Sequence, residues 1–175
     1  MSAPRTDSPG ALPLPRQRRG RGVFIAVIIA VLLALACRLW VMEPVAVDSD
    51  SMQPTVRAGS LVFVFKPGPE LFGVHSGDLV VFPSPADGTP VIKRVVAVGG
   101  QQIEVHDAVL YVDSSPVAEP FVDLATIDGT HYPRTEVPAG TVFVMGDNRE
   151  RSIDSRDYGP VPMENIDGLV LGMRP

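Results

Sequence analysis

The apolar residues of this chain are distributed in two distinct patterns. Residues 23–37 form an uninterrupted run of 15 apolar residues, and residues 39–42 continue it after Arg38. The 21 residues from Gly22 to Met42 would form a helix of roughly 31 Å, which is long enough to cross a bilayer. Arg38 can extend toward the lipid headgroups, and Trp40 suits the membrane interface. We therefore expect a membrane anchor at residues 22–42.

Two other interpretations of the same segment stay open. An arginine-rich start followed by an apolar core also describes a cleavable secretory signal, and Ala34-Leu35-Ala36 supplies a small-x-small site. The pair Ala36-Cys37 faintly resembles a lipoprotein cleavage point. We favour the retained anchor. In all three cases the arginines stay in the cytoplasm and the chain from Glu43 onward faces outward.

Charge is distributed unevenly along the chain. Residues 1–42 carry six arginines and one aspartate, whereas residues 43–175 carry nine basic and 19 acidic residues. Residues 1–21 are rich in Pro, Ser and Arg and have no apolar periodicity, which predicts a disordered cytoplasmic tail. Because the acidic remainder repels phosphate, we expect a lipid bilayer rather than nucleic acid as the partner of the basic segment.

Beyond Glu43 the pattern becomes typical of β-structure. Short runs rich in Val, Ile and Phe alternate with clusters of Pro, Gly, Asp and Ser, and 18 prolines disfavour long helices. Helices of the kind that connect parallel strands are not predicted, so the sequence favours an all-β, mainly antiparallel domain. The expected strands lie near residues 45–47, 60–65, 78–82, 91–98, 101–105, 109–112, 141–145 and 168–173.

Two segments carry candidate chemistry. Ser51 lies in an Asp- and Ser-rich stretch before Pro54, which could be an ordinary turn. Lys93 is one of only two lysines and adjoins Arg94 within a predicted strand, so the two cations point to opposite faces. Such a lysine can be an edge-strand residue that discourages aggregation. Alternatively, it can be a desolvated amine whose lowered pKa lets it act as a base.

A third segment, residues 146–156, is densely polar and directly follows an apolar strand. It could be a solvated loop, but its charged, Asn and Ser residues also suit a hydrogen-bonded network that fixes side chains. The histidines, His75, His106 and His131, lie in expected turns or loops without a paired motif. The chain has one cysteine, so we expect neither a Ser-His-Asp triad nor a metal site.

Together these segments resemble type I signal peptidases. A Ser-Met-x-Pro-Thr box begins at Ser51, a Lys-Arg pair at Lys93, and a Gly-Asp-Asn-Arg-x-x-Ser-x-Asp-Ser-Arg box at Gly146, in the family order. The Gly-Asp-Leu-Val-Val-Phe run from Gly77 resembles a fourth box. The resemblance covers residues 22–175. It implies a partly open β-barrel over residues 43–175 and a small cap insertion at about residues 101–140.

The resemblance also implies a role for particular residues. Ser51 would be the nucleophile and Lys93 its neutral general base, while Ser49 would contribute a hydroxyl to the oxyanion alongside the Ser51 N–H. A substrate strand would lie beside residues 90–92. The remaining assignments are Ser152, Asp154, Arg156 and Asp147 for orienting and supporting the lysine, and Met52, Val56 and Ile92 for the substrate pocket.

The function implied is cleavage of signal peptides from preproteins after small-x-small sites at the plasma membrane, without metal or cofactor. A peptidase that processes conjugation proteins would share the same core. Self-cleaving repressors also use Ser and Lys but need a DNA-binding domain where this chain has an apolar segment. An inactive, membrane-tethered β-rich binding module is a further alternative, disfavoured because both Ser51 and Lys93 are present. One departure is Val98-Gly99-Gly100-Gln101-Gln102, which stands where many relatives have Gly-x-Pro-Gly-Asp.

Overall fold

The apolar N-terminal segment forms a helix. The computed structural model describes residues 19–122 and 131–172, so residues 1–18 of the tail expected at residues 1–21 lie outside the described residues. Helix α1 spans Arg19–Trp40, and residues 20–38 are long and apolar enough to cross a membrane by length and composition. The helix begins earlier than the anchor expected at residues 22–42 and ends before Met42, where a strand starts. Pro44 within that strand is incompatible with further helix.

Residues 36–175 form a compact unit of their own, and its larger sheet has seven strands. Their order is β1-β2-β11-β3-β4-β9-β10, and every pair is antiparallel. The sheet is open, because β1 and β10 form its two edges. The bounds are β1 Met42–Ala46, β2 Leu61–Phe65, β3 Leu79–Pro83, β4 Pro90–Val98, β9 Thr141–Met145, β10 Val161–Pro162 and β11 Gly168–Val170.

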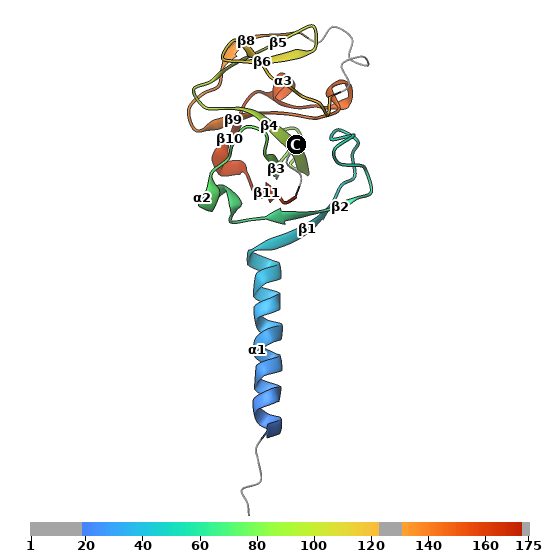
Figure 1. The fold of residues 1–175 in the computed structure, drawn as a ribbon, viewed down its shortest axis with the longest axis vertical. Helices are drawn as coiled ribbons and strands as arrows, with labels where there is room; N and C mark the ends of the chain where they lie inside the picture. The colour runs from blue at the N-terminus through green and yellow to red at the C-terminus, as the bar shows by residue number, and fades with distance from the viewer. Residues whose placement is uncertain (1–18, 123–130, 173–175) are drawn as a thin grey trace, which may run out of the picture. The chain divides into compact units, whose positions relative to one another are not determined.

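A second, four-stranded antiparallel sheet has the order β7-β6-β5-β8. Figure 1 shows it as a separate layer beyond β4 and β9, at the end of the unit away from β1 and β2. With two mainly antiparallel sheets and only short helices in this unit, the predicted all-β, partly open barrel architecture is confirmed. The bounds are β5 Gln102–His106, β6 Val109–Val112, β7 Ser115–Pro116, β8 Tyr132–Glu136, α2 Gly68–Phe72 and α3 Ser155–Tyr158.

Side-chain alternation sorts the apolar residues of the sheets into three core clusters. Strand β4 contributes to all of them, with Val95 in the first, Ile92 in the second and Val96 in the third. The third cluster lies where the second sheet covers β4 and β9. Because both faces of β4 are covered, Lys93 and Arg94 are both buried, with 4% and 3% of their surface exposed.

The sequence did not predict three strands, and it placed one histidine wrongly. Strand β8 contains Pro133 and Arg134 and has little apolar alternation, because it lies at an edge of the second sheet. Strands β7 and β10 have two residues each, too few for a periodic pattern. His106 is the last residue of β5 rather than a loop residue.

Candidate active site

Ser51 lies in a turn that follows β1. Its neighbour Met52 and Val56 are each 1% exposed and pack in the second core cluster. The turn is closed by the Val56 N–H, which donates to the Met52 carbonyl at 2.8 Å. These two buried apolar side chains fix the turn, so Ser51 is held in place with 7% of its surface exposed.

The hydroxyls of Ser49 and Ser51 converge. Their Oγ atoms are 3.2 Å apart, and Ser49 is the exposed member of the pair. Asp50 between them forms a bend and Ser51 begins the turn, so the chain direction changes where the two hydroxyls meet. Both hydroxyls can therefore contact a single bound group.

Lys93 occupies the middle of β4, opposite Val80 of β3. Its Nζ donates a hydrogen bond to Ser152 Oγ at 2.9 Å. Alternation places Val91 and Val95 on the same face of the strand, and both belong to the apolar cluster there. Burial lowers the pKa of Lys93 because desolvation disfavours the cation; the Asp154 carboxylate opposes this shift.

A network of charged residues positions Ser152. Asp154 is fully buried and accepts from the Gly146 N–H at 2.9 Å, while the Arg156 Nε and Nη2 donate to its two oxygens at 2.8 and 2.9 Å. Asp154 is also the N-cap of α3 and forms a capping box with Asp157. The short helix α3 thereby fixes the end of the segment that carries Ser152.

Gly146 lies where the serine turn meets the segment that bears Ser152. A Cβ at this position would lie 2.3 Å from Ser152 Oγ and 2.6 Å from the Ser51 carbonyl oxygen. That same carbonyl accepts from the Asn148 N–H at 3.0 Å, and the Asn148 side chain donates to the Asp50 carbonyl at 3.2 Å. The Ser51 carbonyl and the Ser152 side chain thus lie against one glycine, and Ser152 in turn contacts Lys93. Within the described chain the lysine amine donates to Ser152, and Ser51 and Lys93 share no hydrogen bond.

Arg94 and Asp147 form a buried ion pair on the other face of β4. Arg94 Nε and Nη2 each donate to one Asp147 oxygen at 2.8 Å, and Nη1 donates to the Gly77 carbonyl at 2.9 Å. Their side chains are 3% and 0% exposed. This bidentate pair joins β4 to the residue that follows Gly146, so the strand with Lys93 and the segment with Ser152 are tied together.

A groove of about 260 Å³ opens beside the serine turn. It lies between the end of β1 and the start of β4, and Ser49, Met52 and Ile92 are among its lining residues. Val56, also predicted for a pocket, lies instead in the core beneath the turn. Among the described strands, β4 pairs with β9 only from Arg94 onward, so residues 90–92 present a free backbone edge to the groove.

The sequence analysis missed several residues of this region, among them Asn148, Arg149, Glu119 and Phe121. Asn148 and Arg149 lie inside the third motif, but only their tertiary contacts give them roles. Glu119 and Phe121 come from a segment with no motif of its own. Among residues 19–122 and 131–172, no group of three or more His, Cys, Asp or Glu could hold a metal ion.

These features define a class of protein. A constrained serine, a buried lysine with a lowered pKa and a groove bordered by free strand edges can support acyl transfer on an extended peptide. Acyl transfer from a peptide to water is the reaction of a peptidase, a class of hydrolase. The N-terminal apolar helix is consistent with attachment of such a hydrolase to a membrane.

Comparison with known proteins identifies the family. The family model described as "Signal peptidase, peptidase S26" matches residues 21–172. The chain is 38% identical over 154 residues to "Probable signal peptidase I-1" of Synechocystis sp., covering 82% of this chain and 76% of the relative. It is 34% identical over 163 residues to "Signal peptidase I V" of Bacillus subtilis, covering 84% and 94%.

A solved structure agrees with these sequence matches. The crystal structure of a signal peptidase I from Enterococcus faecalis superposes with a TM-score of 0.51 at 29% identity, covering 55% of this chain and 95% of that one. The chain therefore belongs to the signal peptidase family, as its motifs predicted.

Proposed function

We propose that this chain is a membrane-bound serine endopeptidase that removes signal peptides from preproteins after small-x-small sites, with Ser51 as nucleophile and Lys93 as general base. The observation that carries the proposal is the state of Lys93. Its amine is buried, its pKa is lowered by desolvation, and Ser152 holds it beside the turn that bears Ser51. A lysine that is neutral at working pH can accept a proton, whereas an ordinary surface lysine cannot.

The reaction then proceeds through an acyl-enzyme. Ser51 Oγ forms a bond to the scissile carbonyl carbon as its proton passes to Lys93 Nζ. The oxyanion is stabilised by the Ser51 N–H and the Ser49 hydroxyl, whose Oγ lies 3.2 Å from that of Ser51. Lys93 next gives its proton to the departing amine, and the signal peptide stays esterified to Ser51. A water molecule, deprotonated by Lys93, releases it and restores the Ser51 hydroxyl.

The groove accounts for recognition of an extended peptide. Its free edge at residues 90–92 can take the substrate as an added strand, so backbone hydrogen bonds supply affinity without regard to side chains. Met52 and Ile92 line the groove with apolar surface, which favours apolar over charged substrate side chains.

The topology we propose has residues 1–21 in the cytoplasm, residues 22–42 in the plasma membrane and residues 43–175 outside as the catalytic domain. The arginine-rich start favours this orientation. In addition, Leu61 and Phe63 project from the outer face of β2 with 65% and 53% of their surface exposed, and β2 pairs with β1, which begins at Met42. Because β1 directly follows the anchor in the sequence, this exposed apolar surface on its partner strand supports activity at a membrane surface. Protease added outside should digest the domain and spare the tail. Digestion of the tail alone would show that the chain has the opposite orientation.

The test of activity uses the detergent-solubilised full chain and a preprotein ending its signal in Ala-x-Ala. Ser51→Ala and Lys93→Ala should each abolish cleavage. The chain has one other lysine, so Lys66→Ala is a matched control, and Ser115→Ala is the corresponding serine control on an exposed strand. Both controls should cleave like the wild type. Cleavage at an undiminished rate by Ser51→Ala or Lys93→Ala would refute the assignment of the pair.

A further inference from the structure

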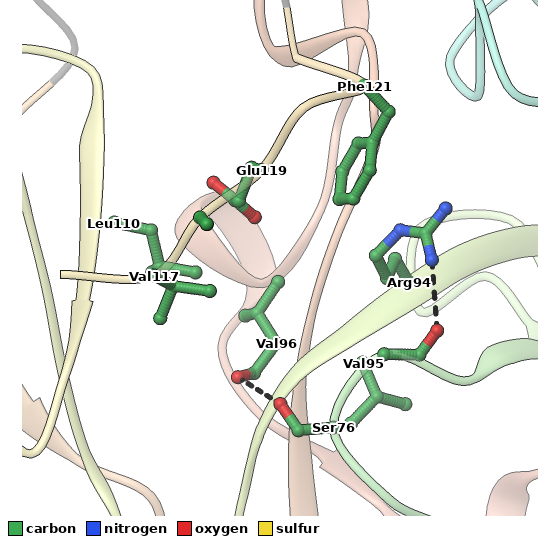
Figure 2. A pocket seen from close by; sticks show the side chains of 10 residues that line it. Ser76, Arg94, Val95, Val96, Leu110, Val117, Glu119 and Phe121 are labelled. Carbon is green, nitrogen blue, oxygen red and sulfur yellow. Dashed lines mark hydrogen bonds between the residues drawn. The ribbon is translucent and has the colours of Figure 1, made fainter. Parts of the chain in front are cut away.

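A short segment that follows β7, residues 117–122, crosses to the first sheet and meets two buried arginines. We call it the strap. The Val117 N–H donates to the Leu110 carbonyl at 2.9 Å, and a turn from Glu119 to Val122 is closed by a 3.0 Å backbone bond. Pro120 occupies the second position of that turn, where its fixed φ is favourable. Figure 2 shows Glu119 and Phe121 projecting from the strap, with the Phe121 ring facing Arg94.

Two side chains of the strap, Phe121 and Glu119, each contact one arginine. The Arg94 guanidinium lies 4.1 Å from the centroid of the Phe121 ring, a cation–π contact. Glu119 Oε1 accepts from Arg149 Nη2 at 2.5 Å, and these side chains are 6% and 2% exposed. The strap is therefore fixed to both segments of the candidate active site, β4 through Arg94 and the third motif through Arg149.

Arg149 contacts Gly146 directly. Its Nε donates to the Gly146 carbonyl at 3.0 Å, while its own carbonyl accepts from Arg156 Nη2 at 2.8 Å. Gly146 in turn lies against Ser152 and the Ser51 carbonyl. A continuous set of contacts thus runs from Glu119 through Arg149 and Gly146 to the proposed nucleophile and to the partner of the proposed base.

The charge balance of this region depends on Glu119. Three arginines of the site are mostly or wholly buried, and each pairs with a carboxylate: Arg94 with Asp147, Arg156 with Asp154, and Arg149 with Glu119. Asp147 and Asp154 lie within the third motif, whereas Glu119 comes from the strap. Among the described residues, Glu119 is the carboxylate that pairs with the buried Arg149 cation. The other terminal nitrogen of Arg149, Nη1, has no hydrogen-bond partner there, so the guanidinium depends on Glu119 for its charge compensation.

We propose that Glu119 is a positioning residue for the Ser51–Lys93 pair, acting through Arg149 and Gly146. The proposal rests on the function proposed above. Without the carboxylate, the buried Arg149 cation has to move toward water, and the Gly146 carbonyl that it holds moves with it. The strap would thereby contribute to catalysis, although neither Glu119 nor its neighbours on the strap line the substrate groove.

The experiment compares Glu119→Gln with Glu136→Gln, which removes the same charge from an exposed position on β8. Since a misplacement near 1 Å is costly, Glu119→Gln should lower kcat at least about tenfold with KM within about twofold. Glu136→Gln should match the wild type. Hydrogen exchange should show faster exchange around residues 145–152 in Glu119→Gln alone, with β3 and β4 still protected, which separates local displacement from global unfolding.

A double-mutant cycle tests whether Glu119 acts through Arg149. In an Arg149→Met background, where no buried cation needs compensation, Glu119→Gln should change kcat by less than about twofold. The proposal would be overturned if the losses in kcat of Glu119→Gln and Arg149→Met multiply in the double variant. It would also be overturned if the kcat of Glu119→Gln alone is within about twofold of the wild type. Failure of the underlying function looks different, because Ser51→Ala and Lys93→Ala would then remain active whatever the result at Glu119.

Discussion

Replacing Gly146 by alanine should disable the enzyme while leaving it folded. The added Cβ would lie 2.3 Å from Ser152 Oγ, 2.4 Å from Ser152 Cβ and 2.6 Å from the Ser51 carbonyl oxygen, where 3.4–4 Å is ordinary contact. Rotating the Ser152 hydroxyl away does not remove the clash, because its Cβ and the Ser51 carbonyl remain. Gly146 itself is held at its N–H by Asp154 and at its carbonyl by Arg149. Ser51 or Ser152 must therefore shift, by roughly 1 Å.

The expected magnitudes follow from that displacement. A shift of this size in positioned catalytic groups costs about 10²-fold in kcat. Overpacking of a well-filled region costs about 1–3 kcal/mol in the free energy of unfolding. KM should change little, because the groove between β1 and β4 does not include Gly146.

The assay measures kcat and KM on one preprotein, together with urea unfolding followed by far-UV circular dichroism. Gly22→Ala is the matched control, because a Cβ there has nothing within 4 Å and the backbone is helical. It should keep the wild-type kcat. If Gly146→Ala cleaves within about threefold of the wild-type rate, the reasoning that Gly146 sets the spacing of Ser51 and Ser152 is refuted.

Three other substitutions test separate parts of the site. Ser49→Ala should lower kcat by roughly 10²–10³, or about 2.7–4 kcal/mol, with KM nearly constant, and a loss below about tenfold would leave the oxyanion to backbone donors. Asp157 raises the pKa of Lys93, so Asp157→Asn should move the acid limb of the kcat profile to lower pH; an unmoved or raised limb contradicts this. Asp147→Asn strands the buried Arg94 cation and should cost about 3–5 kcal/mol in urea unfolding, whereas a cost below about 1 kcal/mol would mean that the pair is dispensable.

Local features of the chain were predictable from the sequence. The apolar run predicted α1, and the short runs of Val, Ile and Phe predicted most strands of the larger sheet, among them β4 with Lys93 and Arg94. The Ser51 turn is also local, since Met52 and Val56 follow within five residues and fix it. In each case the determining residues lie close together in the chain.

Long-range packing accounts for what the sequence did not predict. Burial of both Lys93 and Arg94 requires the second sheet to cover the opposite face of β4, and no local pattern shows that cover. The Glu119–Arg149 pair joins residues 30 positions apart, without a motif around Glu119. Strand β8 pairs at a sheet edge with Pro133 and Arg134 exposed, so it lacks the apolar alternation by which strands are recognised. Only the tertiary fold brings these elements together.

The central claim, that Lys93 is the neutral base for Ser51, can be tested by titrating this lysine directly. The sequence contains only two lysines, so protein labelled with ¹³C-lysine gives two Cε signals by NMR, and a Lys66→Arg variant assigns them. Because desolvation lowers the pKa of Lys93, its signal should titrate below the ordinary value of 10.5. The midpoint should coincide with the acid limb of kcat, since activity rises as the amine loses its proton. A Lys93 that titrates at its ordinary value, or an acid limb that does not follow it, would contradict the account.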